Sequence, residues 1–321
     1  MRVAGSGILA GIPIGPPPSQ GKVANMFTVS LIARPGALDP ALAEALRNAW
    51  GGGDLVWLSP DEAAEFDMAK VPDTVMTSWT SLQEQRVDLA VQPSVGRRKK
   101  MLLADMDSTM IQQECIDELA DVAGVGPKVK EITARAMNGE LDFEGALLER
   151  VALLKGLPET VIDTVIADRI TLMPGGATLL ATMKDNGGYA ALVSGGFTSF
   201  TSRVARALGF DENRANTLIA DNGVLTGDVG RPILGRDAKV AALEDITARL
   251  GLDADDVLAV GDGANDLGML QRAGAGVALH AKPSVQAQAD LRINHGDLTA
   301  LLFLQGYSRD MFVTPEDPVL V

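Results

Sequence analysis

Short, almost wholly apolar runs recur along the chain from residue 101 onward, with longer helical stretches between them. The runs occupy residues 101–104, 189–193, 257–260, 276–279 and 291–294. Strands of a parallel sheet that is covered on both faces are apolar throughout, whereas a sheet with one wet face alternates polar and apolar residues. The runs therefore predict an α/β fold whose core is a parallel sheet with helices on both faces.

An insertion with a helical pattern, residues 115–170, lies between the first and second apolar runs. Four helices are expected in it, over residues 115–123, 127–137, 142–155 and 158–168. We interpret the insertion as a helical cap. Further along, Asn222 and Gly223 stand between two β-prone runs and predict a type I′ hairpin turn. Residues 237–250 carry an apolar face typical of an amphipathic helix.

A smaller unit, residues 26–95, precedes the sheet. Its expected strands cover residues 28–32, 54–58 and 87–91. Asp39 followed by Pro40 predicts the start of a helix that runs to about Trp50, and the glycines that begin at Gly51 end it. These elements predict a small α+β domain that is shortened after its second strand and carries no catalytic constellation.

The other boundaries follow from these units. The sheet domain is expected at residues 96–114 and 171–310, and residues 1–25 and 311–321 are predicted to be tails. The first tail loosely imitates a signal peptide, but glycines and prolines interrupt its apolar part, which favours a flexible segment. No apolar stretch reaches the ~18–20 residues that a membrane helix needs. We therefore expect a cytoplasmic protein without a membrane partner.

Composition excludes several classes of function. The chain has 28 Lys and Arg against 42 Asp and Glu, a formal net charge of −14, which argues against nucleic acid and anionic membranes as partners. One cysteine and two histidines in 321 residues exclude a disulfide framework and a Cys/His zinc cluster. The basic run at residues 97–100 could contact phosphate, but in so acidic a chain we expect a solvated strand entrance. The oligomeric state stays open, and a homodimer is compatible with the sequence.

Functional groups follow three of the apolar runs, at the point where each strand is expected to end. They are Asp105 and Asp107 after the first run, Ser194, Gly195 and Gly196 after the second, and Asp262, Asn265 and Asp266 after the third. Ligands of open α/β sheets bind outside the carboxyl ends of the strands, so these groups are expected to share one site. Paired carboxylates can hold a cation, attack phosphorus and transfer protons. A hydroxyl beside bare backbone amides suits a phosphate.

Lys239, in the first turn of the predicted helix 237–250, can neutralise a phosphate as a point charge, although lysines at helix starts are usually solvated. Competing motifs fail. The nucleophile-elbow pattern G-x-S-x-G is not met, because Leu192 occupies its first position. The sequence contains neither a Walker A loop nor GxGxxG after the first strand. Phosphate chemistry is thus favoured over a serine hydrolase or a dinucleotide-binding enzyme.

The three groups at successive strand ends, together with Lys239, resemble in their order along the chain the haloacid dehalogenase superfamily of phosphohydrolases. Five stretches extend the resemblance to the phosphoserine phosphatase family within it. They are Asp105 to Thr109 with Glu114, Met137 to Phe143 with Arg150, Val193 to Phe197, Leu225 to Val229, and Val260 to Asp266. The resemblance covers about residues 100–300 and implies a Rossmann-like core of this superfamily, with its parallel sheet and an inserted helical cap.

The resemblance implies a role for each carboxylate at the strand ends. Asp105 would be the nucleophile that accepts the phosphoryl group, and Asp107 would be the general acid and base. The implied cofactor is Mg²⁺, held by the carboxylates of Asp105 and Asp262 and by the backbone carbonyl of Asp107. Such hard oxygen ligands are the ones that Mg²⁺ prefers.

The groups that the resemblance implies would hold the transferring oxygens are Ser194, Gly195, Gly196 and Lys239. Together they would supply the electrostatic part of phosphoryl transfer. Asn265 would contact the phosphate or a metal-bound water. Asp266 would orient Lys239 without touching the substrate.

Substrate choice depends on Glu114 and Arg150, which suit the ammonium and the carboxylate of a phosphorylated amino acid. Without the resemblance, both could simply be exposed helix charges. Met137 and Phe143 would line the apolar wall of a closing cap that excludes water. The implied activity is hydrolysis of O-phospho-L-serine to L-serine and phosphate through an aspartyl-phosphate, the last step of serine biosynthesis.

Two other functions remain open at this point. One is a phosphatase or phosphotransferase of the same superfamily that acts on another small phosphorylated metabolite. The other is a ligand-binding scaffold without catalysis, which would be expected to have lost one of the aspartates. Residues 26–95 weakly resemble amino-acid-binding regulatory modules of the ACT type, which implies a role in serine feedback or in dimerisation.

Overall fold

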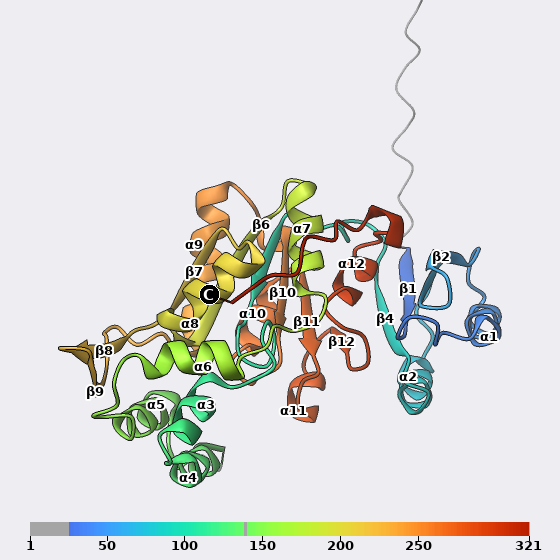
Figure 1. The fold of residues 1–321 in the computed structure, drawn as a ribbon. Helices are drawn as coiled ribbons and strands as arrows, with labels where there is room; N and C mark the ends of the chain where they lie inside the picture. Colours follow the sequence, from blue (N-terminus) through green and yellow to red (C-terminus); the bar gives the residue numbers. More distant parts are fainter. Residues whose placement is uncertain (1–25, 138–139, 321) are drawn as a thin grey trace, which may run out of the picture.

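The computed structural model describes residues 26–137 and 140–320. A small α+β domain, blue in Figure 1, lies beside one edge of a larger α/β domain, and a group of helices projects from the other end of the latter. The predicted N-terminal tail, residues 1–25, lies outside the described residues. Within the described ranges, no helix is long and apolar enough to cross a membrane.

The larger domain is built on a six-stranded parallel sheet with the strand order β12-β11-β10-β5-β6-β7. The strands are β5 (Met101–Ala104), β6 (Tyr189–Phe197), β7 (Glu212–Asn216), β10 (Val257–Gly261), β11 (Ala275–Leu279) and β12 (Leu291–Ile293). Every residue of β5, β10 and β11 is buried. The predicted parallel sheet is confirmed, and β7 is a strand that the apolar pattern did not reveal.

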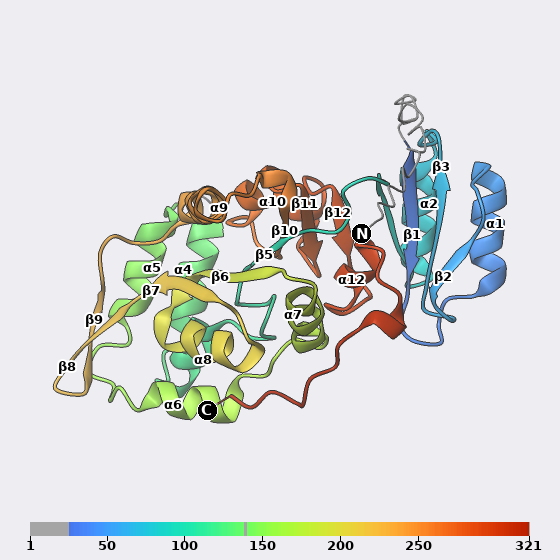
Figure 2. The ribbon, with the colours of Figure 1, turned by 90° about the horizontal axis from the view of Figure 1, so that it is seen from above.

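Helices cover both faces of this sheet, as Figure 2 shows. Alternate residues of β5 point to opposite faces: Leu102 packs in one hydrophobic cluster and Leu103 in the other. The first cluster includes residues of α7 (Gly176–Asp185), α8 (Thr198–Leu208) and α12 (Ala300–Leu304). The second includes residues of α9 (Arg236–Leu250), α10 (Leu267–Arg272) and α11 (Pro283–Gln286). The central strands are therefore dry on both sides, which explains their uniform apolar composition.

The segment between β5 and α7 forms four helices. They are α3 (Cys115–Val122), α4 (Gly126–Met137), α5 (Phe143–Ala152) and α6 (Val161–Arg169). These agree with the expected helices except that α5 ends and α6 begins three residues from the predicted positions. A hairpin of β8 (Leu218–Asp221) and β9 (Val224–Val229) lies against them, and its turn has positive φ at Asn222 and Gly223, as a type I′ turn requires.

The N-terminal domain is a four-stranded antiparallel sheet with two helices. Its elements are β1 (Phe27–Ile32), α1 (Pro40–Trp50), β2 (Val56–Ser59), β3 (Ala63–Met68), α2 (Val75–Glu84) and β4 (Asp88–Pro93). The strand order β2-β3-β1-β4 in a βαββαβ chain is that of ferredoxin-like folds. The predicted α+β class is confirmed, but the expectation that the domain is shortened after its second strand is wrong, because β3 and α2 follow it. The resemblance to ACT modules stays a prediction.

The two domains are joined by polar contacts at the edge of the large sheet. The buried Asp88 carboxylate of β4 accepts backbone N–H bonds from Asn294 (2.8 Å), His295 (3.0 Å) and Gly296 (2.8 Å), just after β12. Three charge-assisted hydrogen bonds to one buried carboxylate hold the domains in a fixed orientation.

The basic run 97–100 lies at the same junction, and its charges are matched locally. Arg97 pairs with Glu65 at 2.7 Å, Lys100 pairs with Asp256 at 3.0 Å, and the Arg98 guanidinium lies 4.2 Å from the centre of the Tyr307 ring. Arg98 and Lys100 are exposed, as expected of a solvated strand entrance, whereas the Arg97 side chain is largely buried against Glu65. Beyond the 3-10 turn η2 (Arg309–Met311), residues 312–320 form neither helix nor strand.

Candidate active site

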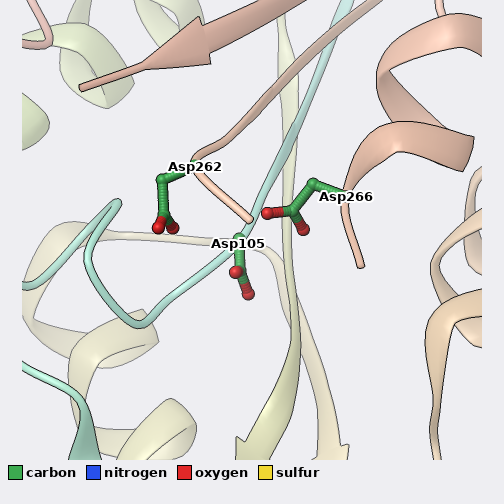
Figure 3. A group of neighbouring side chains, drawn as sticks. All are labelled: Asp105, Asp262 and Asp266. Carbon is green, nitrogen blue, oxygen red and sulfur yellow. The ribbon is translucent and has the colours of Figure 1, made fainter. Parts of the chain in front are cut away.

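The strand ends meet because of the sheet register. Ala104, the last residue of β5, is paired with Val260 of β10 on one side and Leu192 of β6 on the other. The residues that follow these positions therefore emerge at the same edge of the sheet. Figure 3 shows Asp105, Asp262 and Asp266 close together there, and one carboxylate oxygen of each lies within 4.8 Å of those of the other two.

Lys239 lies among these carboxylates and not in solvent. Its ammonium is 2.6 Å from Asp105 Oδ1 and 2.5 Å from Asp266 Oδ1, and the lysine is only 2 % exposed. Burial alone would lower the pKa of Lys239, but the charges of Asp105 and Asp266 outweigh it and hold the pKa above its usual value. The solvated helix-start lysine considered from sequence is therefore not what this chain contains.

Both oxygens of Asp266 are already engaged. Oδ1 accepts a hydrogen bond from Lys239, and Oδ2 accepts the backbone N–H of Gly263 at 2.9 Å. The carboxylate is completely buried. A Cβ atom at Gly261 would lie 2.4 Å from Asp266 Cγ, so glycine is required there. Although Asp266 belongs to the acidic cluster, these contacts leave Asp105 and Asp262 as the carboxylates free to hold a metal.

The carboxylate oxygens that remain are suitable ligands for Mg²⁺. Asp105 and Asp262 offer hard carboxylate oxygens at a sheet edge, and Thr109 Oγ1 steadies Asp262 by donating to its Oδ1 at 3.2 Å. Burial, followed by the Asp266 charge, raises the pKa of Asp262 to about 6. The same two causes raise the pKa of Asp105 well above its usual value, against the opposing charge of Lys239. Additional positive charge at this position would relieve the repulsion between the carboxylates.

Asp107 is held at the N-terminus of α3. Its Oδ1 accepts the backbone N–H of Cys115, the first residue of that helix, at 2.8 Å, and its Oδ2 accepts a hydrogen bond from Ser194 Oγ at 3.3 Å. Burial raises the pKa of Asp107, although the hydrogen bonds from Cys115 and Ser194 oppose it. A carboxyl with a raised pKa and a fixed orientation suits proton transfer near neutral pH. Asp107 is not one of the three carboxylates that lie within 4.8 Å of one another, although its charge still acts on Asp105.

The predicted phosphate-binding segment, Ser194 to Gly196, does not follow the strand as expected but lies in the last part of β6, where the pairing with β7 is interrupted between Val193 and Phe197. This segment, called the phosphate loop below, lies against Asp107. Gly196 N–H donates to Ser194 Oγ at 2.8 Å, and α8 begins at Thr198, immediately beyond the loop. A Cβ atom at Gly196 would lie 2.7 Å from Asp107 Oδ2, and one at Gly195 would lie 3.0 Å from Phe143 Cζ. Bare backbone is therefore a steric requirement at Gly196, whereas a side chain at Gly195 would press on the Phe143 ring.

Glu114 and Arg150 lie close enough to Asp107 for its charge to act on both. Glu114 is open to solvent and accepts a hydrogen bond from Ser108 Oγ at 2.8 Å, while the surrounding protein, followed by the Asp107 charge, raises its pKa to about 7. Arg150 of α5 is half-buried, and burial lowers its pKa against the charges of Asp117, Glu114 and Asp107. Within residues 26–137 and 140–320, no carboxylate lies at salt-bridge distance from its guanidinium, whose Nε donates to Ala146 O at 3.1 Å.

The other predicted residues are placed less centrally. Phe143, the first residue of α5, packs against the phosphate loop at Gly195. Asn265 is half-buried in the loop between β10 and α10, and its side chain folds back over Gly263. The side chain of Met137, the last residue of α4, lies outside the described part of the chain.

Sequence reasoning assigned no role to three residues that support the site. Thr109 bonds Asp262, and Ser108, which has a positive φ of 54°, bonds Glu114. Asn216, at the end of β7, makes three hydrogen bonds to loops around the site. Ser108 and Thr109 directly follow the paired aspartates, which was a usable signal. Asn216 gave none, because its strand was not recognised.

Comparison with known proteins agrees with this geometry. Residues 102–271 match the family model of haloacid dehalogenase-like hydrolases. The chain is 43% identical over 228 residues to phosphoserine phosphatase SerB2 of Mycobacterium tuberculosis, a match that covers 70% of this chain but only 56% of that protein. It is 48% identical over 200 residues to a phosphoserine phosphatase of Streptococcus thermophilus, covering 62% of this chain and 93% of the relative.

A solved structure extends the similarity to the N-terminal domain. The crystal structure of a HAD family hydrolase from Salmonella enterica serovar Typhi matches with a TM-score of 0.79 and 32% identity. That match covers 87% of this chain and 98% of the other, which is more than the large domain alone. The matched family model, the relatives and the shared fold together show that this chain belongs to the haloacid dehalogenase-like hydrolase family.

Proposed function

We propose that this protein is a Mg²⁺-dependent phosphoserine phosphatase that releases L-serine and phosphate from O-phospho-L-serine. The observation that carries the proposal is that Glu114 and Arg150 lie close enough to Asp107 for its charge to act on both, next to the buried pair of Asp105 and Lys239. The names of the two relatives above support the same substrate. On this proposal the enzyme works in the cytoplasm at the last step of serine biosynthesis.

The first chemical step uses Asp105 as nucleophile. An Asp105 oxygen attacks phosphorus, the bond from phosphorus to the serine oxygen breaks, and the departing oxygen takes a proton from Asp107. Repulsion between the carboxylate and the phosphate dianion opposes this attack. The Lys239 ammonium, 2.6 Å from Asp105, reduces that repulsion. Bound Mg²⁺ on Asp105 and Asp262 would supply further charge neutralisation for the transferring group.

The second step returns the enzyme to its starting state. Asp107, now ionised, takes a proton from water, and the oxygen of that water attacks the phosphorus of the aspartyl-phosphate. The bond between phosphorus and the Asp105 oxygen breaks, which releases phosphate. The hydrogen bonds from Cys115 and Ser194 keep the Asp107 carboxyl in one orientation for both proton transfers.

We assign substrate recognition to the charges of Glu114 and Arg150. Glu114 suits the ammonium of phosphoserine, and Arg150, which has no salt-bridge partner among the described residues, suits its carboxylate through a bidentate contact. Phe143 contacts Gly195 of the phosphate loop, so the helical segment can exclude water while the aspartyl-phosphate exists. An ester without an amino-acid head group would lack both polar contacts.

The proposal is tested by phosphate release from O-phospho-L-serine, with and without Mg²⁺. We expect turnover by the wild type, none after chelation of divalent metal, and none by Asp105→Asn. Appreciable turnover by Asp105→Asn would contradict the assignment of the nucleophile. A product other than free phosphate in the presence of added alcohols would indicate a phosphotransferase instead.

Recognition is tested separately with Arg150→Ala and a generic aryl phosphate. The loss of a charged hydrogen-bond pair should raise KM for phosphoserine about 10-fold or more, with little change for the aryl ester. Arg135→Ala is the matched control, because Arg135 is on the neighbouring helix α4 and pairs with Glu149 at 2.8 Å. Equal effects of Arg150→Ala on the two substrates would refute the role in recognition.

A further inference from the structure

Asn216 connects two loops that border the site. Its amide Nδ2 donates to Gly195 O at 2.9 Å and to Leu234 O at 3.1 Å, and its Oδ1 accepts the backbone N–H of Leu234 at 2.7 Å. The residue is only 2 % exposed. Gly195 belongs to the phosphate loop, whereas Leu234 belongs to the segment before α9. One buried side chain therefore holds both segments.

The segment before α9 is held at both ends to the last residue of β7 and the residue that follows it. Gly230 N–H donates to Thr217 O at 2.8 Å, next to Asn216, and Leu234 bonds Asn216 itself. Gly235 follows as the N-cap of α9, four residues before Lys239. The position of Lys239 therefore depends on where Asn216 holds this segment.

The same two segments receive the ring of Phe143. A Cβ atom at Gly195 would lie 3.0 Å from Phe143 Cζ, and one at Gly235 would lie 3.4 Å from Phe143 Cδ1. The ring thus packs between two glycines, one from each segment that Asn216 bonds. A change in the spacing of the segments would change this contact as well as the phosphate loop.

We propose that Asn216 is a positioning residue of this enzyme, one that fixes the phosphate loop and the start of α9 in a single frame. With these two segments held in place, one phosphoryl group can be contacted by the backbone amides of Gly195 and Gly196 and by the ammonium of Lys239. The ring of Phe143 then packs between the two segments. This inference rests on the proposed phosphoryl transfer. It does not depend on phosphoserine being the substrate.

Asparagine is the residue type that this position requires. Its two loop contacts need a donor toward two carbonyls and an acceptor toward one N–H, which a carboxamide provides in one plane. Aspartate has the same shape but would aim a carboxylate oxygen at Gly195 O and Leu234 O. Alanine would leave the N–H and both carbonyls without their partner in a buried position.

The test compares Asn216→Ala and Asn216→Asp with the control Asn213→Ala. Asn213 is on the same strand, and its Oδ1 accepts a hydrogen bond from Thr201 Oγ1 at 2.8 Å, away from both loops. Three quantities are measured in the Mg²⁺-loaded protein: thermal stability, kcat for an aryl phosphate, and the inhibition constant of orthovanadate. Orthovanadate reports on the phosphate loop whatever the natural substrate is.

We expect both Asn216 variants to lower kcat on the order of 100-fold, which is the effect of misplacing a group that contacts the substrate by about 1 Å. Both variants should also raise the inhibition constant of orthovanadate about 10-fold or more. Asn213→Ala should destabilise the protein with less than about a 3-fold change in either constant. An unchanged orthovanadate constant, an equal loss in Asn213→Ala, or full activity of Asn216→Asp would overturn the inference. If Asn216→Ala does not fold, the isosteric Asn216→Asp decides. Failure to hydrolyse phosphoserine while these effects persist would sink only the proposed substrate.

Discussion

Asp266→Asn is the substitution whose consequence follows most directly from the site. The change keeps the shape of the side chain and removes its charge. In the wild type, one oxygen accepts from Lys239 at 2.5 Å and the other accepts from Gly263 N–H at 2.9 Å, in a completely buried position. An amide has a single acceptor oxygen. In either orientation, its NH₂ group must face a donor, the Lys239 ammonium or the Gly263 N–H.

The magnitude follows from these two contacts. A buried donor left without an acceptor costs about 1–3 kcal/mol, and Lys239 also loses one of its two compensating charges. Removal of one partner of a buried ion pair destabilises by about 3–5 kcal/mol. We expect a loss of that size in the free energy of unfolding. Catalysis should fall as well, because Lys239 would then be paired with Asp105 alone.

The assay is denaturant unfolding in a chelating buffer, so that metal binding does not contribute to stability. Asp168→Asn is the control, because Asp168 is exposed on α6 and its change should cost less than about 0.5 kcal/mol. The slopes of the transitions must agree among the variants for the comparison to hold. A loss below about 1 kcal/mol for Asp266→Asn would refute the reasoning that both oxygens of Asp266 are structurally required.

Three further predictions concern recognition, the phosphate loop and the domain junction. The pKa of Glu114 is raised to about 7, so its carboxyl becomes neutral below that pH and attracts the substrate ammonium less. The ratio of kcat/KM for phosphoserine to kcat/KM for an aryl phosphate should therefore fall below pH about 7. In Glu114→Gln this ratio should not depend on pH in that range. Gly196→Ala would place a Cβ atom 2.7 Å from Asp107 Oδ2 and should lower kcat on the order of 100-fold, a result that an effect on KM alone would contradict. Asp88→Ala removes the acceptor of three backbone N–H groups and should lower the free energy of unfolding by at least about 3 kcal/mol. Amide hydrogen exchange at residues 294–296 should become faster. Unchanged exchange at these residues would refute the role of Asp88 in joining the domains.

Sequence reasoning succeeded where burial is uniform. The apolar runs of β5, β10 and β11 are dry on both faces, so their composition alone revealed a parallel sheet. Because the carboxyl ends of parallel strands share one edge, the meeting of Asp105 with Asp262 followed from topology. Topology did not predict the ion pairs of Lys239, since a lysine in the first turn of a helix is usually solvated; the contact with Asp266 was expected only from the family resemblance.

The elements that were not predicted are those whose polar side chains have partners elsewhere in the folded structure. Strand β7 is at the edge of the sheet, and its charged side chains are matched from α9: Arg214 with Asp245, and Glu212 with Arg249. Such a strand shows no apolar period. Asn216 at its end was invisible for the same reason, because its partners are backbone atoms of loops that are distant in sequence.

The central claim is that Asp105 carries the phosphoryl group between two half-reactions. The measurement that tests it most directly is rapid quenching of the Mg²⁺-loaded enzyme with radiolabelled O-phospho-L-serine, followed by mapping of the labelled peptide. We expect label on the peptide that contains Asp105, loss of that label during turnover at least as fast as phosphate appears, and no label on Asp105→Asn. Label on another residue, or single-turnover release of phosphate without any labelled protein, would contradict it.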